Sequence, residues 1–182
     1  MKRPLGSTGL AVGPIGLGGM PLSIQNRPDE RAALAVIEAF VAGGGDHIDT
    51  AISYCFDEHD FGHNERLIAK ALKKLGRADV VVATKGGLTR PDGRWEVDCS
   101  PQWLRHCCEQ SAKTLGAPIP LYYLHTVDPA VPLAESLGEL VRLRDEGKIA
   151  AIGLSNVNAR HLDEALRITP IAAVQNRCNV LD

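Results

Sequence analysis

The sequence has 182 residues, of which 45% are hydrophobic and 23% are charged, with a net charge of -2 at pH 7. This balance is typical of a globular chain and excludes a disordered one. No run of Lys and Arg is longer than a pair, and no window reaches the roughly 18 apolar residues of a membrane span. We therefore expect neither nucleic acid nor a membrane as a partner.

The N-terminal residues and the cysteines indicate the cellular compartment. Residues 1–6 lack the apolar stretch of a secretory signal, which predicts a cytoplasmic protein. The cysteines are five in number and form no Cys-x-x-Cys pair: Cys55, Cys99, Cys107, Cys108 and Cys178. This pattern favours reduced thiols over a disulfide framework or a zinc ribbon.

Short apolar runs alternate with helical patterns along the whole chain, as in βαβ units around a parallel sheet. Before the first of them, residues 4–14 contain the turn sequence Gly6-Ser7-Thr8-Gly9 and are expected to form a hairpin. Six runs, several of them rich in β-branched residues, predict strands: residues 15–17, 47–49, 80–84, 121–124, 150–154 and 172–175.

Five helices are predicted between these strands. Their ranges are residues 29–42, 64–75, 100–115, 132–146 and 159–167. The first four are followed by glycine stops at Gly43, Gly76, Gly116 and Gly147. Ser100 followed by Pro101 is typical of a helix N-terminus, with a capping hydroxyl and a proline at the first helical position.

No linker or low-complexity tract divides the chain, so residues 1–182 are expected to form one α/β domain. Two parallel architectures compete, a doubly wound open sheet and a barrel. A doubly wound dinucleotide-binding sheet carries Gly-x-Gly-x-x-Gly after its first strand. Here residues 16–21 place Pro21 at the third glycine position, and no P-loop sequence is present. This counts against the doubly wound sheet.

Polar residues follow the predicted strands at the point where each strand ends. They are Asp49, Lys85, His125, the pair Ser155-Asn156, and Gln175. A buried strand otherwise avoids such residues. In a barrel, the C-terminal ends of the strands share one mouth, and catalytic groups come from several of them. The coincidence on successive strands favours a barrel with an active site at that mouth.

The residue types at this mouth suit proton transfer to a reduced carbonyl. Hydride addition to a carbonyl leaves an alkoxide, which needs an acid nearby. Tyr54 is the candidate acid, and we expect the adjacent Lys85 ammonium to lower its pKa towards neutrality. Asp49 would hold Lys85 charged, and His125 would orient the carbonyl by hydrogen bonding.

These residues resemble the motifs of a known family. Asp49 and Tyr54 stand in a stretch similar to the Asp-x-Ala-x-x-Tyr segment of aldo-keto reductases, and Lys85 and His125 resemble the catalytic lysine and histidine of that family. The similarity continues through the stretches around residues 62–65, 147–156 and 174–176. The resemblance implies a (β/α)8 barrel of the TIM type that reduces an aldehyde or ketone to an alcohol with NAD(P)H.

Residue by residue, the resemblance implies a catalytic tetrad and a cofactor site. The tetrad is Asp49, Tyr54, Lys85 and His125. The cofactor-binding positions are Ser155, Asn156 and Gln175 around the nicotinamide, with Gly18 and Met20 where family members line the pocket. The cofactor implied is NADP(H), with NAD(H) as the alternative, and the partner is a small carbonyl substrate.

A metal site is the competing interpretation of the same mouth. His47 and Asp49 lie two apart on one strand and, with His125, are compatible with a metal hydrolase on this kind of barrel. Lys85 beside Asp49 would compete with a cation for the carboxylate, and a hydrolase has no evident use for a Tyr-Lys pair. We therefore expect no metal.

A complete barrel has eight β/α units and about 250 residues, whereas this sequence contains six predicted strands. In the family, the loops after strands seven and eight clamp the pyrophosphate and adenosine of the cofactor. The prediction is thus an incomplete barrel whose first and sixth strands are exposed edges, which favours self-association. Two alternatives to an active reductase stay open: a non-catalytic cofactor-sensing or regulatory subunit, and an inactive truncated fragment.

Overall fold

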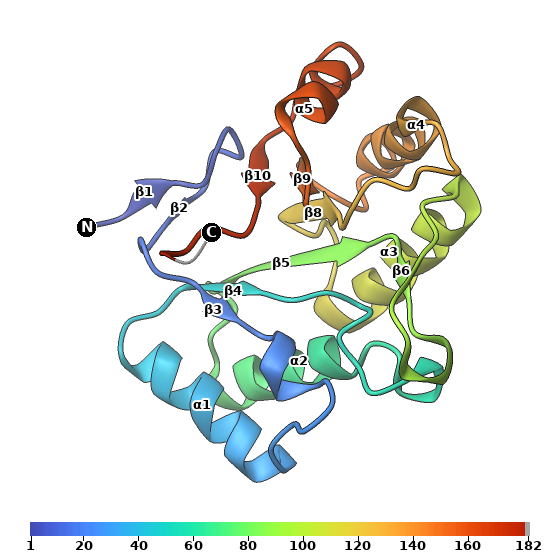
Figure 1. Cartoon of the computed structure of the whole chain (residues 1–182). Helices are drawn as coiled ribbons and strands as arrows, with labels where there is room; N and C mark the ends of the chain where they lie inside the picture. The colour runs from blue at the N-terminus through green and yellow to red at the C-terminus, as the bar shows by residue number, and fades with distance from the viewer. Residues whose placement is uncertain (181–182) are drawn as a thin grey trace.

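The computed structural model describes residues 1–180, so positions 181 and 182 of the expected domain lie outside the described part (Figure 1). Its main feature is a six-stranded parallel sheet in the order β10-β9-β8-β5-β4-β3. The strands are β3 (Leu17–Gly18), β4 (His47–Asp49), β5 (Val81–Gly86), β8 (Leu121–Leu124), β9 (Ile152–Ser155) and β10 (Ala173–Gln175). The six predicted strands are confirmed.

The strand ends differ from the prediction at informative places. β5 continues two residues beyond the predicted end, because Lys85 and Gly86 pair with Tyr123 and Leu124 of β8. Lys85 therefore lies inside the ladder instead of following it. The first strand begins later than predicted. Ile15 was expected to be its first residue, but Ile15 is 75% exposed and lies outside β3.

Five helices connect the strands: α1 (Glu30–Ala42), α2 (His63–Leu75), α3 (Pro101–Leu115), α4 (Leu133–Asp145) and α5 (Ala159–Leu166). Each begins and ends within two residues of its predicted bounds. The side chains of Asp29, Ser100 and Asn158 accept backbone N–H groups at the starts of α1, α3 and α5. Gly76 ends α2 in the left-handed conformation that glycine favours.

The helices cover one face of the sheet and make two of its apolar cores (Figure 1). One core joins α1 and α2 to β4 and β5 through residues such as Ile37, Ile48 and Ile68. The other joins α3 and α4 to β8 and β9 through residues such as Leu104 and Leu137. Within residues 1–180, no helix is both long enough and apolar enough to cross a membrane.

The opposite face of the sheet carries a smaller core that the N-terminal hairpin completes. This hairpin pairs β1 (Arg3–Pro4) with β2 (Ala11–Val12), as predicted. Leu5 packs with Ala83, Leu121 and Tyr123 on that face. The hairpin turn reaches β10, where a Cβ atom on Gly6 would lie 1.6 Å from the carbonyl oxygen of Ala172. Only glycine fits so close an approach.

The sheet is curved. In a flat sheet, β4 and β10 would lie about 19 Å apart, because strands four positions apart are separated by four spacings of about 4.8 Å. Instead, Gln175 at the end of β10 donates a hydrogen bond to Asp49 at the end of β4 over 2.9 Å. β3 and β10 each have one strand neighbour among the described residues. The structure is therefore a partial (β/α)8 barrel, which confirms the expected fold class.

A second hairpin, β6 (Leu88–Thr89) with β7 (Glu96–Val97), was not predicted. It follows β5 directly and leads to α3. Three short 3-10 turns complete the structure: η1 (Met20–Leu22), η2 (Glu58–Asp60) and η3 (Pro91–Gly93). The turn of the second hairpin contains Pro91-Asp92-Gly93, a turn signal comparable to the one that predicted the first hairpin, although strands of two residues add no alternating pattern of apolar and polar residues to that signal.

Glu65, in the first turn of α2, is fully buried behind β5. One carboxylate oxygen accepts hydrogen bonds from the hydroxyls of Thr84 (2.6 Å) and Ser111 (2.7 Å). The other oxygen has no partner within residues 1–180. Burial raises the pKa of Glu65 to about 7, although the two hydroxyls oppose the shift.

We expect Glu65 to make the protein less stable as the pH rises. The folded state holds the proton more tightly than the unfolded state, whose pKa is near 4.5. Its favourable contribution is thus complete below pH 4.5 and is lost as the pH rises to 7. Between about pH 5 and 8, the unfolding free energy should fall by about 2 kcal/mol more in the wild type than in Glu65→Gln.

Urea unfolding of both proteins at the two pH values measures this difference. Glu135→Gln, a change on the exposed surface of α4, is the matched control and should leave the pH dependence unchanged. Equal pH dependence in the wild type and Glu65→Gln would contradict a proton held by the buried carboxyl.

Candidate active site

The C-terminal ends of the strands bring the predicted tetrad together. Asp49 ends β4, Lys85 is the penultimate residue of β5, and His125 directly follows β8. Tyr54 comes from the turn after β4, where its backbone N–H donates to the carbonyl of Ala51. Because parallel strands end at one edge of the curved sheet, four residues separated by up to 76 positions meet in one cluster.

Lys85 is the centre of this cluster. Its ammonium nitrogen lies 2.8 and 2.7 Å from the two oxygens of Asp49, 2.9 Å from the carbonyl oxygen of Thr50 and 3.1 Å from the hydroxyl of Tyr54. The residue is completely buried. Burial lowers the pKa of Lys85, and the carboxylate of Asp49 opposes that shift. The ion pair is therefore what allows a cation to stay in this position.

Tyr54 is 7% exposed, and burial raises its pKa well above the usual range, with the negative charge of Asp49 adding to the effect. The sequence-based expectation was the opposite, that Lys85 would lower this pKa. The difference has a physical reason, because the charge of Lys85 is balanced by Asp49 at shorter range. Tyr54 thus keeps its proton at neutral pH, as a proton donor requires.

His125 faces Tyr54. The two rings make an edge-to-face contact, with centroids 5.6 Å apart and planes at 76°. Burial and the nearby charge of Lys85 lower the pKa of His125 to about 3. Its Nδ1 atom has no hydrogen-bond partner in the described part of the chain. His125 is therefore a neutral imidazole with hydrogen-bonding capacity to spare.

Three predicted cofactor residues lie at the same mouth. Gln175 contacts Asp49 through its amide nitrogen, as described above. The amide nitrogen of Asn156 donates to the carbonyl oxygen of His125 (3.0 Å) and to the hydroxyl of Ser155 (3.2 Å). No hydrogen bond within residues 1–180 uses the amide oxygens of Asn156 and Gln175. The mouth therefore offers free acceptors beside the tetrad.

The other two predicted cofactor residues lie on the first strand and the turn after it. Gly18 pairs with Asp49 in the sheet register, and nothing lies within 4 Å of the place where its Cβ would be. Met20, in η1, is 39% exposed. Gly18 is thus next to Asp49 of the tetrad. For Met20, no hydrogen bond with a tetrad residue is seen within residues 1–180.

Two residues that shape the site, Asn64 and Trp95, were not predicted from the sequence. The buried amide of Asn64 accepts a hydrogen bond from the hydroxyl of Thr50 (2.6 Å) and donates to the carbonyl of Gly19 (2.8 Å). It thereby holds the segment after Asp49 against the segment after β3. Its stretch was noted only as part of the family resemblance. Trp95 packs edge-on against Tyr54 with centroids 6.4 Å apart, and no pattern in the sequence marked it.

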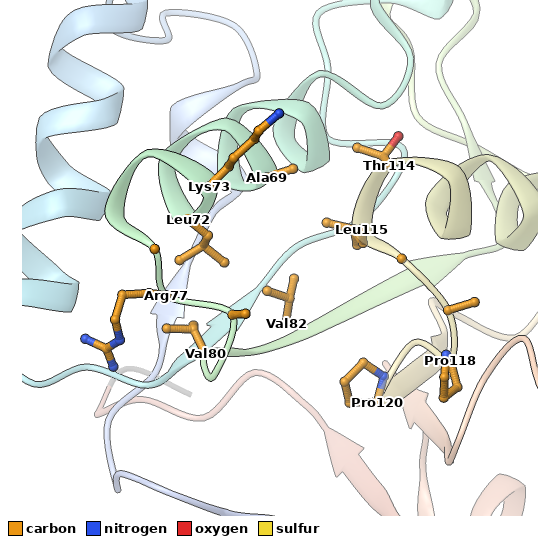
Figure 2. A pocket seen from close by; sticks show the side chains of 14 residues that line it. Ala69, Leu72, Lys73, Arg77, Val80, Val82, Thr114, Leu115, Pro118 and Pro120 are labelled. Carbon is orange, nitrogen blue, oxygen red and sulfur yellow. The ribbon is translucent and has the colours of Figure 1, made fainter.

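A cavity of about 630 Å³ lies away from this cluster (Figure 2). The ends of α2 and α3 and the beginning of β5 frame it, and most of its lining is apolar, including Leu72, Val82 and Leu115. None of the tetrad residues lines it. The polar cluster, not this cavity, therefore marks the candidate active site.

The structure does not support the alternative of a metal site at the mouth. Within residues 1–180, no group of three His, Cys, Asp or Glu side chains could hold a metal ion. His47 instead contacts the carbonyl of Val81 through its ring nitrogen (3.3 Å). Both oxygens of Asp49 already contact the ammonium of Lys85.

We expect Asp49→Asn to destabilise the protein by about 3 kcal/mol, because it leaves the Lys85 ammonium buried without a counter-charge. Adding Lys85→Met should recover part of that loss, so the double variant costs less than the sum of the single variants. Chemical unfolding of the four proteins measures the coupling.

The surface pair Arg77 and Asp79 is the control, and Asp79→Asn should destabilise the protein far less than Asp49→Asn, because solvent screens this pair. Additive effects of Asp49→Asn and Lys85→Met would contradict the dependence of Lys85 on Asp49.

Comparison with known proteins identifies the family of the chain. Residues 14–182 match the model of the aldo/keto reductase family. A probable aldo-keto reductase of Glycine max is 39% identical over 177 residues, which is 94% of this chain and 49% of that protein. The chain thus spans about half the length of this relative.

Solved structures of aldo-keto reductases are also similar to this chain and are also longer than it. An aldo-keto reductase of Bacillus halodurans, in its holo form, is 29% identical with a TM-score of 0.83, and the alignment covers 97% of this chain and 57% of that one. The glycerol dehydrogenase of Gluconobacter oxydans is 28% identical with a TM-score of 0.85, and the coverage is 100% and 56%. The tetrad motifs, the partial barrel and the family match lead to one conclusion: the chain belongs to the aldo/keto reductase family.

Proposed function

We propose that this chain carries the catalytic residues of a reductase that converts an aldehyde or ketone to an alcohol with NAD(P)H, with Tyr54 as the general acid. One observation carries the proposal. The buried ammonium of Lys85 contacts the hydroxyl of Tyr54 (3.1 Å) and the carboxylate of Asp49 (2.7 Å) at the same time. This arrangement places a protonated phenol beside a fixed positive charge.

Each tetrad residue has a defined task in this reaction. A reduced nicotinamide would supply the hydride, and the carbonyl oxygen then needs a proton. Tyr54 provides the proton, since burial keeps its phenol protonated. The adjacent Lys85 ammonium stabilises the negative charge left on the Tyr54 oxygen. Asp49 keeps Lys85 charged, and the neutral imidazole of His125 donates a hydrogen bond to the carbonyl oxygen.

The residues at the mouth fit a nicotinamide carboxamide. Such a group needs acceptors for its NH₂ and a donor for its oxygen. The amide oxygens of Asn156 and Gln175 supply the acceptors, and the Ser155 hydroxyl, which already accepts from Asn156, keeps its own proton to donate. Gly18 leaves open space beside Asp49. We propose NADP(H) as the cofactor, with NAD(H) as the alternative.

The remaining proposals concern partners and location. The substrate is a small carbonyl compound, and the likeness to a glycerol dehydrogenase suggests that the alcohol can also be oxidised in the reverse direction. The edge strands β3 and β10 suggest self-association, because Val174 on β10 is 44% exposed and each of the two strands has one strand neighbour among residues 1–180. A cytoplasmic location stays a prediction.

We expect Tyr54→Phe to lower kcat by about a thousandfold, the size expected for loss of a general acid, while cofactor binding stays unchanged. The assay follows consumption of NADPH and NADH with a panel of aldehydes. It uses the 182-residue chain and the same chain joined to the C-terminal part of the Bacillus halodurans reductase.

Tyr122→Phe is the matched control. Tyr122 is buried on the helix side of the sheet, and its hydroxyl has no hydrogen-bond partner in the described part of the chain, so its removal should leave kcat unchanged. Turnover of Tyr54→Phe at the rate of the Tyr122→Phe control would reject Tyr54 as the acid.

A further inference from the structure

Arg90, in the turn of the β6–β7 hairpin, is a buried arginine that forms no ion pair with a carboxylate within residues 1–180. Its side chain is the largest of the fully buried ones, with 1% of the residue exposed. One terminal nitrogen donates to the side-chain oxygen of Gln25 (3.0 Å) and to the carbonyl oxygen of Phe56 (2.9 Å). The other two nitrogens have no acceptor within residues 1–180. Its direct contacts are therefore with polar groups and one aromatic ring, and the carboxylate of Asp57 acts on its charge from a longer distance.

That ring belongs to Trp95. The central carbon of the Arg90 guanidinium lies 3.7 Å from the centroid of the indole, which is a stacked cation–π contact. Trp95 in turn lies at 82° to the ring of Tyr54, with centroids 6.4 Å apart. Trp95 is 44% exposed. It thus has one face on Arg90, a contact with the candidate acid, and the rest of its surface open.

Arg90 also joins three segments that are distant in the sequence. Gln25 precedes α1, Phe56 follows the tyrosine turn, and Arg90 itself belongs to the hairpin. Gln25 strengthens the junction by donating to the carbonyl oxygen of Phe56 (3.2 Å). The backbone N–H of Asp92 in the hairpin turn donates to a carboxylate oxygen of Glu58 (2.7 Å). The Arg90 guanidinium and the contact between Asp92 and Glu58 therefore fix the hairpin to the segment that follows Tyr54.

We propose that Arg90 is a positioning residue that holds Trp95 as an aromatic wall beside Tyr54, and that this wall favours carbonyl substrates with a flat, unsaturated group. A flat group can stack on the open indole surface, whereas a short aliphatic chain gains little from it. The kinetic consequence rests on the proposed reductase function. The placement of Trp95 by Arg90 does not, and it is measurable without any turnover.

Fluorescence tests the placement. The chain has two tryptophans, Trp95 and Trp103, so Trp103→Phe leaves Trp95 as the sole reporter. In that background, Arg90→Met removes the planar cation, and acrylamide quenching of Trp95 should rise about twofold, towards that of a fully exposed indole. The control is Arg94→Met in the same hairpin, since Arg94 is exposed and pairs with Asp92 and Glu96 instead of Trp95.

Two results would overturn the placement. One is unchanged quenching in Arg90→Met with an unchanged circular dichroism spectrum. The other is an equal rise in Arg94→Met, which would indicate general loosening of the hairpin. If Arg90→Met does not fold, Arg90→Lys carries the same test, because it keeps the charge and loses the planar face; its quenching should rise, and no change would overturn the proposal.

Kinetics test the specificity in any form of the protein that turns over. The KM for benzaldehyde should rise about fivefold or more in Arg90→Met, while kcat and the KM for propanal stay within about twofold of the wild type. An equal change for both aldehydes would overturn the aromatic wall. Absence of turnover in the wild type would instead reject the proposed function, and the fluorescence result would be unaffected.

Discussion

The buried ion pair between Lys85 and Asp49 is the interaction on which the rest of the site depends. A cation inside a parallel sheet is unfavourable unless a carboxylate accompanies it. Asp49 provides that carboxylate from the neighbouring strand, with both oxygens within 2.8 Å of the ammonium. The same carboxylate accepts a hydrogen bond from Gln175 at the far edge of the sheet. The ion pair and the hydrogen bond from Gln175 therefore join the ends of β4, β5 and β10 at one mouth.

The ion pair also determines the proton chemistry next to it. Because Asp49 balances the charge of Lys85, burial dominates at Tyr54 and the phenol keeps its proton. The same burial, with the charge of Lys85, keeps His125 neutral. A protonated phenol, a neutral imidazole and a fixed ammonium within one cluster are the groups that a carbonyl needs as it accepts a hydride. The protonation states of Tyr54 and His125 thus follow from burial as well as from the neighbouring charges.

Much of the fold was predictable because local signals and the global topology agree. Glycine stops and capping side chains such as Ser100 mark the helix ends, and apolar runs mark the strands. The clustering of the four tetrad residues could be predicted, because Asp49, Lys85 and His125 lie at or just after the C-terminal ends of successive strands and Tyr54 lies in the turn after the first of them. The β6–β7 hairpin was not predicted, although Pro91-Asp92-Gly93 in its turn is a turn signal. The burial of Arg90 could not be predicted, because an arginine in a turn is ordinarily exposed. The direction of the Tyr54 pKa shift also depended on burial, which no pattern of residues reveals.

The most direct test is the protonation state of Tyr54 in the folded protein. The chain contains three tyrosines, so NMR of protein labelled at tyrosine Cζ, with Tyr54→Phe to assign the signal, can follow this residue alone. The Tyr54 signal should remain that of a phenol from about pH 7 to 10, the range in which a free tyrosine begins to ionise. A phenolate signal from Tyr54 that grows in below about pH 9 would mean that Lys85 outweighs burial and Asp49, and would contradict the account.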